Sequence, residues 1–193
     1  AEESYLIVSI GDWVLETACR VLARWAEQPS LAEVTLAVNI SPLQFHQPDF
    51  VSRLEAIIAT TGAPAARLKL ELTESLFMEE PNAARDAMLR LKALGVRFSL
   101  DDFGTGYSSL SYLNRLPLDQ LKIDQSFVRP LFQDSANQVI CATIIDLGRN
   151  LELEVIAEGV ETVAQRDWLV AHGCQVMQGF LVAPGLTLEE TQN

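Results

Sequence analysis

The sequence has few basic residues, few cysteines and no long apolar run, and each shortage excludes a class of protein. Its 193 residues include 14 Lys and Arg against 26 Asp and Glu, which gives a formal net charge of −12. Proteins bind nucleic-acid polymers largely by neutralising phosphates with Lys and Arg, so a chain this acidic is not expected to bind one. A small phosphate ester remains open as a ligand, because bound divalent cations reverse the local charge.

The cysteines and the apolar segments bear on the cellular compartment. Cys19, Cys141 and Cys174 are odd in number, far apart and in no CxxC arrangement, so neither a disulfide framework nor a zinc site is expected. No segment approaches the roughly 18 unbroken apolar residues of a membrane helix, and the first residues lack a basic signal-peptide region. We therefore predict a cytoplasmic domain with buried free thiols. A membrane anchor in a longer parent protein stays open.

Short apolar runs alternate with longer helical patterns along the whole chain, and no linker interrupts them. The runs predict strands at 34–38, 68–72, 96–100, 118–123, 153–157 and 175–177. Helices are expected from Pro48 up to Gly62, from Pro81 up to Gly95, and behind a capping box of Thr162 and Gln165. An earlier helix is expected from Ile10 to about Ala26. Such alternation predicts one domain over residues 1–193, with parallel strands in either a barrel or a doubly wound sheet.

Polar residues lie at or just after the end of each predicted strand, at intervals of 20 to 36 residues. They are Asn39, Glu71, Asp101 with Asp102, Lys122 with Asp124, Glu158 and Gln178. In a barrel the carboxyl ends of the strands converge on one mouth, whereas a doubly wound sheet spreads them along an edge. We therefore favour a TIM-like (β/α) barrel. It is incomplete in this sequence, because six strands are visible where a closed barrel has eight.

The residues at the strand ends predict a site for two divalent cations. Four carboxylates cannot all stay ionised within a few ångströms unless cations neutralise them, and oxygen ligands suit Mg²⁺ or Mn²⁺. The adjacent Asp101 and Asp102 allow one carboxylate to bridge two ions, an arrangement that suits in-line displacement at phosphorus. Lys122 is then placed to position a water or to neutralise phosphoryl charge.

Two alternatives to the metal site stay open at this point. Each carboxylate taken alone is also typical of a solvated strand end or a helix cap. The position of Lys122 at a strand end also fits a Schiff-base lysine in an aldolase-like lyase. The segment 102–109, with glycines as hinges, predicts a lid over the site. Trp13, Trp25 and Trp168 lie on helical patterns and are predicted to pack in the core.

Six motifs carry a family resemblance across nearly the whole chain, in one consistent order. They are AVNIS (37–41), ELTES (71–75), DDFGTGYSSL (101–110), LKIDQSFV (121–128), AEGVET (157–162) and QGF (178–180). At these motifs the sequence resembles the EAL-domain family, the bacterial phosphodiesterases of the second messenger cyclic di-GMP. The resemblance implies a TIM-like barrel in which one strand is antiparallel. It also implies a hydrolase that uses two Mg²⁺ or Mn²⁺ ions to convert cyclic di-GMP to linear pGpG.

The resemblance also implies roles for individual residues. The metal ligands would be Asn39, Glu71, Asp101, Asp102 and Glu158. Lys122 would hold the reactive water, and Glu158 would be the general base or a ligand. Gln178 would line the site, and Glu74 would anchor a lid of Phe103, Gly104, Thr105, Gly106, Tyr107, Ser108 and Ser109. The family further implies a homodimer, and sensor or GGDEF-type cyclase domains in a longer parent.

One family motif is not found in the sequence. The Glu-Ala-Leu segment, with its metal-binding glutamate and substrate-binding arginine, would precede Ala1, so we expect an N-terminal truncation of the domain. A capping box at Thr187 and Glu190 near the last residue predicts a C-terminal truncation as well. The alternative function is therefore a catalytically inactive module that binds cyclic di-GMP or another protein.

Overall fold

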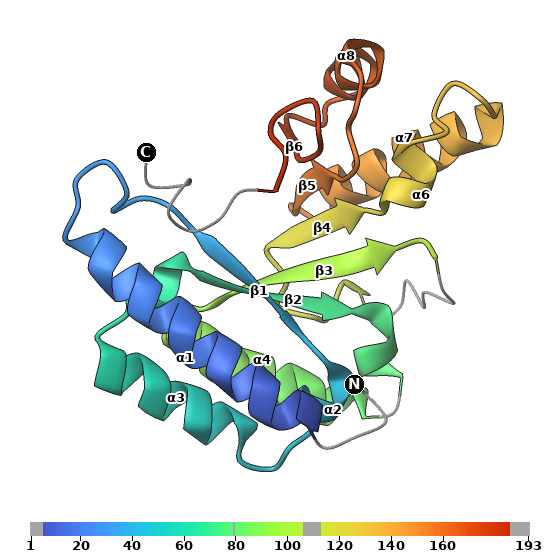
Figure 1. The fold of residues 1–193 in the computed structure, drawn as a ribbon. Helices are drawn as coiled ribbons and strands as arrows, with labels where there is room; N and C mark the ends of the chain where they lie inside the picture. Colours follow the sequence, from blue (N-terminus) through green and yellow to red (C-terminus); the bar gives the residue numbers. More distant parts are fainter. Residues whose placement is uncertain (1–5, 79, 106–112, 186–193) are drawn as a thin grey trace. The chain divides into compact units, whose positions relative to one another are not determined.

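A computed structural model describes residues 6–78, 80–105 and 113–185 of the chain. These residues form six strands, which follow one another in chain order within one sheet (Figure 1). The strands are β1 (Leu36–Ile40), β2 (Leu68–Thr73), β3 (Arg97–Phe103), β4 (Gln120–Ile123), β5 (Glu154–Ala157) and β6 (Val176–Met177). The pairs β1–β2, β4–β5 and β5–β6 are parallel. The predicted α/β class and its six strands are confirmed.

The strand boundaries differ from the prediction by a few residues. The first run was expected at 34–38, whereas β1 begins at Leu36. The reason is pairing, because the register with β2 begins where Leu36 lies opposite Leu68. Hydrophobic content alone does not reveal where a partner strand starts.

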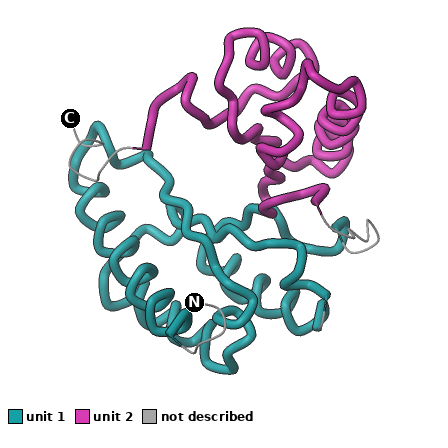
Figure 2. The backbone as a smooth tube through the Cα atoms, turned by 45° about the vertical axis from the view of Figure 1, so that its right-hand side comes forward, with its two compact units in different colours: residues 1–99, 109–118 teal, residues 100–108, 119–193 magenta. Residues whose placement is uncertain are grey.

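The chain divides into two compact units, coloured separately in Figure 2. Unit 1 comprises residues 1–99 and 109–118, and unit 2 comprises residues 100–108 and 119–193. The division falls within β3, so the carboxyl end of that strand belongs to unit 2. The single-domain organisation expected from the sequence stays a prediction. Among the described helices of both units, none combines the length and the apolar character needed to cross a bilayer.

Unit 1 contains β1, β2 and the helices that pack against them. The helices are α1 (Leu6–Ala26), α2 (Pro42–Phe45), α3 (Phe50–Thr61), α4 (Pro81–Ala93) and the short 3₁₀ helices η1 (Ala65–Arg67) and η2 (Glu74–Phe77). Helix α1 lies beside α3 and β1. It begins four residues before the expected Ile10 and buries Leu15, Ala18, Leu22 and Trp25 on one face. Ala18, Leu22 and Trp25 are among the residues whose spacing predicted this helix.

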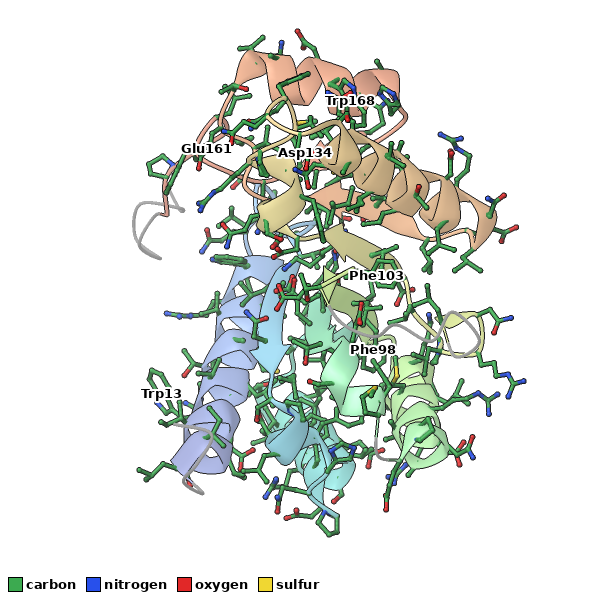
Figure 3. All side chains as sticks on the ribbon, turned by 90° about the vertical axis from the view of Figure 1, so that its right-hand side faces the viewer. Trp13, Phe98, Phe103, Asp134, Glu161 and Trp168 are labelled. Carbon is green, nitrogen blue, oxygen red and sulfur yellow. The ribbon has the colours of Figure 1, made fainter. Side chains whose placement is uncertain are left out.

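The three tryptophans do not all lie in the core. Trp25 is 3% exposed, as predicted, but Trp13 is 66% exposed and lies on the outer face of α1 (Figure 3). The prediction for Trp13 was wrong because this position falls outside the stripe through Leu15, Ala18 and Leu22 that meets the core. Trp168 is partly buried and stacks on His172, with ring centroids 3.7 Å apart.

The predicted helix ends are mostly confirmed. Gly62 follows α3 with a left-handed φ of 70°, and Pro81 is the first residue of α4. Pro48 was expected in the first turn of α3, which was wrong. That helix begins at Phe50 behind Asp49 at its N-cap, so Pro48 lies in the preceding turn.

Unit 2 contains β4 to β6 and the helices α6 (Gln125–Val128), α7 (Ser135–Asn150) and α8 (Val163–Ala171). The predicted capping box at the start of α8 is confirmed. The buried Gln165 does more than cap, because its side chain joins two segments. Its Oε1 accepts hydrogen bonds from the backbone N–H groups of Glu161 and Thr162, both 2.9 Å long. Its Nε2 donates to the carbonyls of Val128 and Arg129, both at 3.1 Å. Gln165 therefore fastens the loop after β5 to the end of α6.

We expect Gln165→Ala to lower the free energy of unfolding by about 2–4 kcal/mol, because four hydrogen bonds to backbone groups are lost. Urea denaturation followed by circular dichroism measures the change. Arg166→Ala is the matched control, since the ion pair of Arg166 is with the exposed Asp167 and its loss should cost under about 0.5 kcal/mol. A loss as small for Gln165→Ala as for the control would contradict the bridging role.

The three cysteines are free and buried, as predicted. Burial raises the pKa of Cys19 to about 11, and burial together with the neighbouring Cys174 raises the pKa of Cys141 to about 12. Burial also raises the pKa of Cys174 to about 11, despite hydrogen bonds to the backbone that act in the opposite direction.

We expect iodoacetamide at pH 8 to leave all three thiols unmodified in the folded protein, because the reactive thiolate is scarce and inaccessible. In guanidinium all three should react, and intact-mass spectrometry counts the adducts. Rapid labelling of any of the three thiols before denaturation would show that its burial is incomplete.

Candidate active site

The centre of the candidate site is an ion-pair triad in unit 2. Lys122 on β4 is only 4% exposed. Its Nζ lies 2.9 Å from Asp101 Oδ1 on β3 and 2.6 Å from Glu158 Oε1 just after β5. The register explains the second contact, since Lys122 lies opposite Ile156 and Glu158 follows two residues later on the same face. A buried ammonium with two carboxylates is held in its charged form.

Asp102 joins the triad because the backbone departs from strand geometry there. Successive residues of a strand point to opposite faces, but carboxylate oxygens of Asp101, Asp102 and Glu158 all lie within 4.8 Å of one another. Asp102 has a left-handed φ of 53°, a conformation that Asp tolerates better than most residues. Thr105 stabilises this turn, because its Oγ1 donates to the Asp102 carbonyl at 2.8 Å. The turn thus brings two successive carboxylates to one place.

Asp124 also belongs to this group, although no role of its own was predicted for it. It caps α6 by accepting a hydrogen bond from the Ser126 N–H at 2.9 Å, and its carboxyl also bonds with that of Asp102. Desolvation, then the charges of Asp101 and Asp124, raise the pKa of Asp102, while Lys122 opposes them. Burial acts to raise the pKa of Asp124, but hydrogen bonds from Ser126 and Asp102 outweigh it and the pKa is lowered. The two carboxyls therefore favour a shared proton or a cation.

Gln178, which follows β6, also reaches the triad. Its Nε2 donates to Glu158 Oε1 at 2.7 Å. A pocket of about 390 Å³ opens beside these two residues, and its wall also includes Gln125, Arg129, Glu161 and Phe180. The strand ends thus combine acidic groups, one lysine and adjoining space for a ligand.

The predicted lid is described only at its start. Phe103 ends β3 and is buried, and Thr105 is exposed. Gly104 has a φ of 96°, and a Cβ at this position would lie 3.2 Å from the Phe127 ring. The remaining predicted lid residues, Gly106, Tyr107, Ser108 and Ser109, lie outside the described residues. The lid and its anchor stay predictions.

The other predicted site residues belong to unit 1. Asn39 near the end of β1 lies directly opposite Glu71 near the end of β2 in the parallel register. Glu74 begins η2 and is half-buried. The structure therefore brings together Asp101, Asp102, Lys122, Glu158 and Gln178 in unit 2, and separately sets Asn39 beside Glu71.

The chemistry of the donor set fits divalent metal ions. Asp101, Asp102, Asp124 and Glu158 supply hard oxygen ligands. In the described part of the chain, the basic group that contacts this set is Lys122, through Asp101 and Glu158. One ammonium cannot balance four carboxylates, so a cation is favoured. The same ion pairs count against the lyase alternative, because Schiff-base formation requires a neutral amine.

These features define an α/β domain with an acidic site, suited to binding divalent cations, at the carboxyl ends of its strands. The EAL domain model matches residues 1–185, and the chain belongs to this family. It is 43% identical over 190 residues to the bifunctional diguanylate cyclase/cyclic di-GMP phosphodiesterase MucR of Pseudomonas aeruginosa, covering 98% of this chain and 28% of that protein. It is 44% identical over 182 residues to an uncharacterized signaling protein of Caulobacter vibrioides, covering 94% of this chain and 22% of the relative.

Solved structures show the same fold. The structure of PaMucR phosphodiesterase in complex with c-di-GMP matches with a TM-score of 0.94 at 43% identity, covering 99% of this chain and 77% of that one. The chain therefore spans only about a quarter of the length of the curated relatives it matches, while it covers most of the length of this solved neighbour.

We expect Asp101→Asn to weaken Mn²⁺ binding by about tenfold or more, because one ligand charge is lost from the cluster. Isothermal titration of the metal-free protein measures the affinity. Asp134→Asn is the matched control, because Asp134 (Figure 3) caps α7 through Ala136 N–H and asparagine preserves that bond. Equal affinities in the two variants would remove Asp101 from the ligand set.

Proposed function

We propose that this domain hydrolyses cyclic di-GMP to linear pGpG, with Mg²⁺ or Mn²⁺ as cofactor. The observation that carries the proposal is the cluster of Asp101, Asp102 and Glu158 around Lys122, in a member of the EAL domain family. The names of similar proteins support the substrate, since MucR is a cyclic di-GMP phosphodiesterase. A manganese/cy-diGMP complex of Klebsiella pneumoniae BlrP1, 31% identical with a TM-score of 0.75, supports the cofactor; it covers 88% of this chain and 44% of that one.

The proposed ligands are Asn39, Glu71, Asp101, Asp102 and Glu158, to which the geometry adds Asp124. Divalent ions bound there would stabilise charge on the attacking and leaving oxygens of the phosphodiester. Support for Asn39 and Glu71 is their opposed position in the β1–β2 register. Support for Asp124 is its hydrogen bond with Asp102.

Lys122 and Glu158 position and deprotonate the attacking water. A water oxygen attacks phosphorus, the P–O bond to the ribose 3′-oxygen breaks, and the leaving oxygen takes a proton from solvent. Glu158 accepts the proton of the attacking water as general base. Lys122 holds that water and offsets charge on the phosphoryl oxygens, a role that its ammonium can fill because Asp101 and Glu158 keep it charged.

The partners follow from the same resemblance. We propose a homodimer, a lid that Glu74 anchors, and sensor or GGDEF-type cyclase domains in a longer parent. MucR, which combines cyclase and phosphodiesterase in one protein, supports the last of these. A cytoplasmic location is proposed from the three free thiols.

We expect the protein to convert cyclic di-GMP to pGpG with Mn²⁺ and to lose this activity in EDTA. Lys122→Met should lower kcat about 100-fold or more, because charge stabilisation and water positioning are both lost. Liquid chromatography of the nucleotides measures both effects. The control is Lys92→Met, whose ammonium instead bonds the Pro117 carbonyl. Binding without turnover in the wild type would favour the inactive module, and neither binding nor turnover would contradict the proposed substrate.

A further inference from the structure

Two hydrogen-bond donors meet on a single oxygen of Glu158. Lys122 Nζ approaches Oε1 at 2.6 Å, and Gln178 Nε2 donates to the same atom at 2.7 Å. The donors come from different places, β4 and the segment after β6, so they fix the carboxylate from two directions. We infer that Gln178 is a positioning residue, which acts on the reaction by holding the Glu158 carboxylate in place and not by contacting the substrate.

The backbone around Gln178 is braced against the same loop. Its N–H donates to the carbonyl of Ala157 at 2.9 Å, and its own carbonyl accepts from the Val160 N–H at 3.1 Å. These two partners flank Glu158 on either side in the sequence. Gln178 therefore bonds with the backbone of Ala157, the side chain of Glu158 and the backbone of Val160. Such a brace holds an amide over one carboxylate more firmly than a side chain on a free loop would.

Gly179 makes this close approach possible. A Cβ at this position would lie 2.3 Å from the Val160 carbonyl oxygen and 2.4 Å from its nitrogen, and both contacts are with backbone. Its φ of 153° is also one that side chains rarely adopt. Glycine at 179 is thus the sequence feature that lets the chain after β6 lie against the loop after β5.

Lysine alone does not orient Glu158. The Lys122 ammonium is shared between Glu158 and Asp101, and its three donors rotate about a flexible stem. The planar amide of Gln178, whose backbone is itself hydrogen-bonded, limits the rotation of the Glu158 carboxylate. Small displacements of a catalytic group cost up to about 100-fold in rate, so the amide should affect turnover more than binding.

The test rests on the proposed function, since it uses cyclic di-GMP as substrate. Gln178→Met keeps the length of the side chain and removes the donor. We expect kcat to fall about 10- to 100-fold, while KM changes less than twofold. The kcat of Gln178→Glu should fall further, because a second carboxylate then faces Glu158. The matched control is Gln175→Met, an exposed glutamine before β6, which should retain full activity. Unchanged kcat in Gln178→Met would overturn the inference.

A binding measurement separates positioning from substrate contact. In a Glu158→Gln background, adding Gln178→Met should change the Kd for cyclic di-GMP less than twofold, measured by isothermal titration with Mn²⁺. A tenfold weaker Kd would mean that Gln178 touches the nucleotide, which overturns the inference.

A crystal structure distinguishes failure of this inference from failure of the proposed function. If the wild type neither binds nor hydrolyses cyclic di-GMP, the proposed function fails, but the structure of Gln178→Met still tests the positioning. We expect the Glu158 carboxylate to turn away from its wild-type orientation while Lys122 still contacts it. A carboxylate that stays in place would show that Gln178 is not needed to hold it.

Discussion

The candidate site depends on one interaction, the contact of the Lys122 ammonium with the carboxylates of Asp101 and Glu158. A lysine this buried is tolerated because the two anions replace its lost hydration, and the anions are tolerated because the lysine lies between them. Removing Lys122 would leave two carboxylates without their shared cation in a largely desolvated place. The parallel register of β4 and β5 keeps Lys122 and Glu158 on one face, so the ion pairs and the sheet support each other.

The remaining charges show why the site favours cations. Beyond the triad, Asp102 and Asp124 share a hydrogen bond, with the pKa of Asp102 raised and that of Asp124 lowered. Opposite pKa shifts are typical of two neighbouring carboxyl groups in which one negative charge disfavours the other. A phosphodiester is itself an anion and would be repelled by four carboxylates. In this chain, with a net charge of −12, divalent ions are the natural means of reversing that repulsion.

The sequence predicted what depends on periodicity and missed what depends on contacts between segments. Lys122 and Glu158 could be placed at strand ends because apolar runs and parallel order are local and regular features. Asp124 received no role because its place before Ser126 is explained equally well by a helix cap. Trp13 was misplaced because a helical pattern gives the spacing of apolar residues but not the edge of the buried stripe. The hydrogen bond between Gln178 and Glu158 depends on the close approach at Gly179, which no local pattern encodes.

The loop that carries Glu158 is held at both ends by glutamines from other segments. Strand β6 has only two residues, so its ladder alone cannot hold the residues that follow it. Backbone bonds from Gln178 to Ala157 and Val160 extend the pairing beyond the strand, while the Gln165 side chain fixes the far end of the loop to α6. A general base must keep its geometry while the substrate and metal ions bind and leave. Two braces on one short loop meet that requirement without a long strand beneath it.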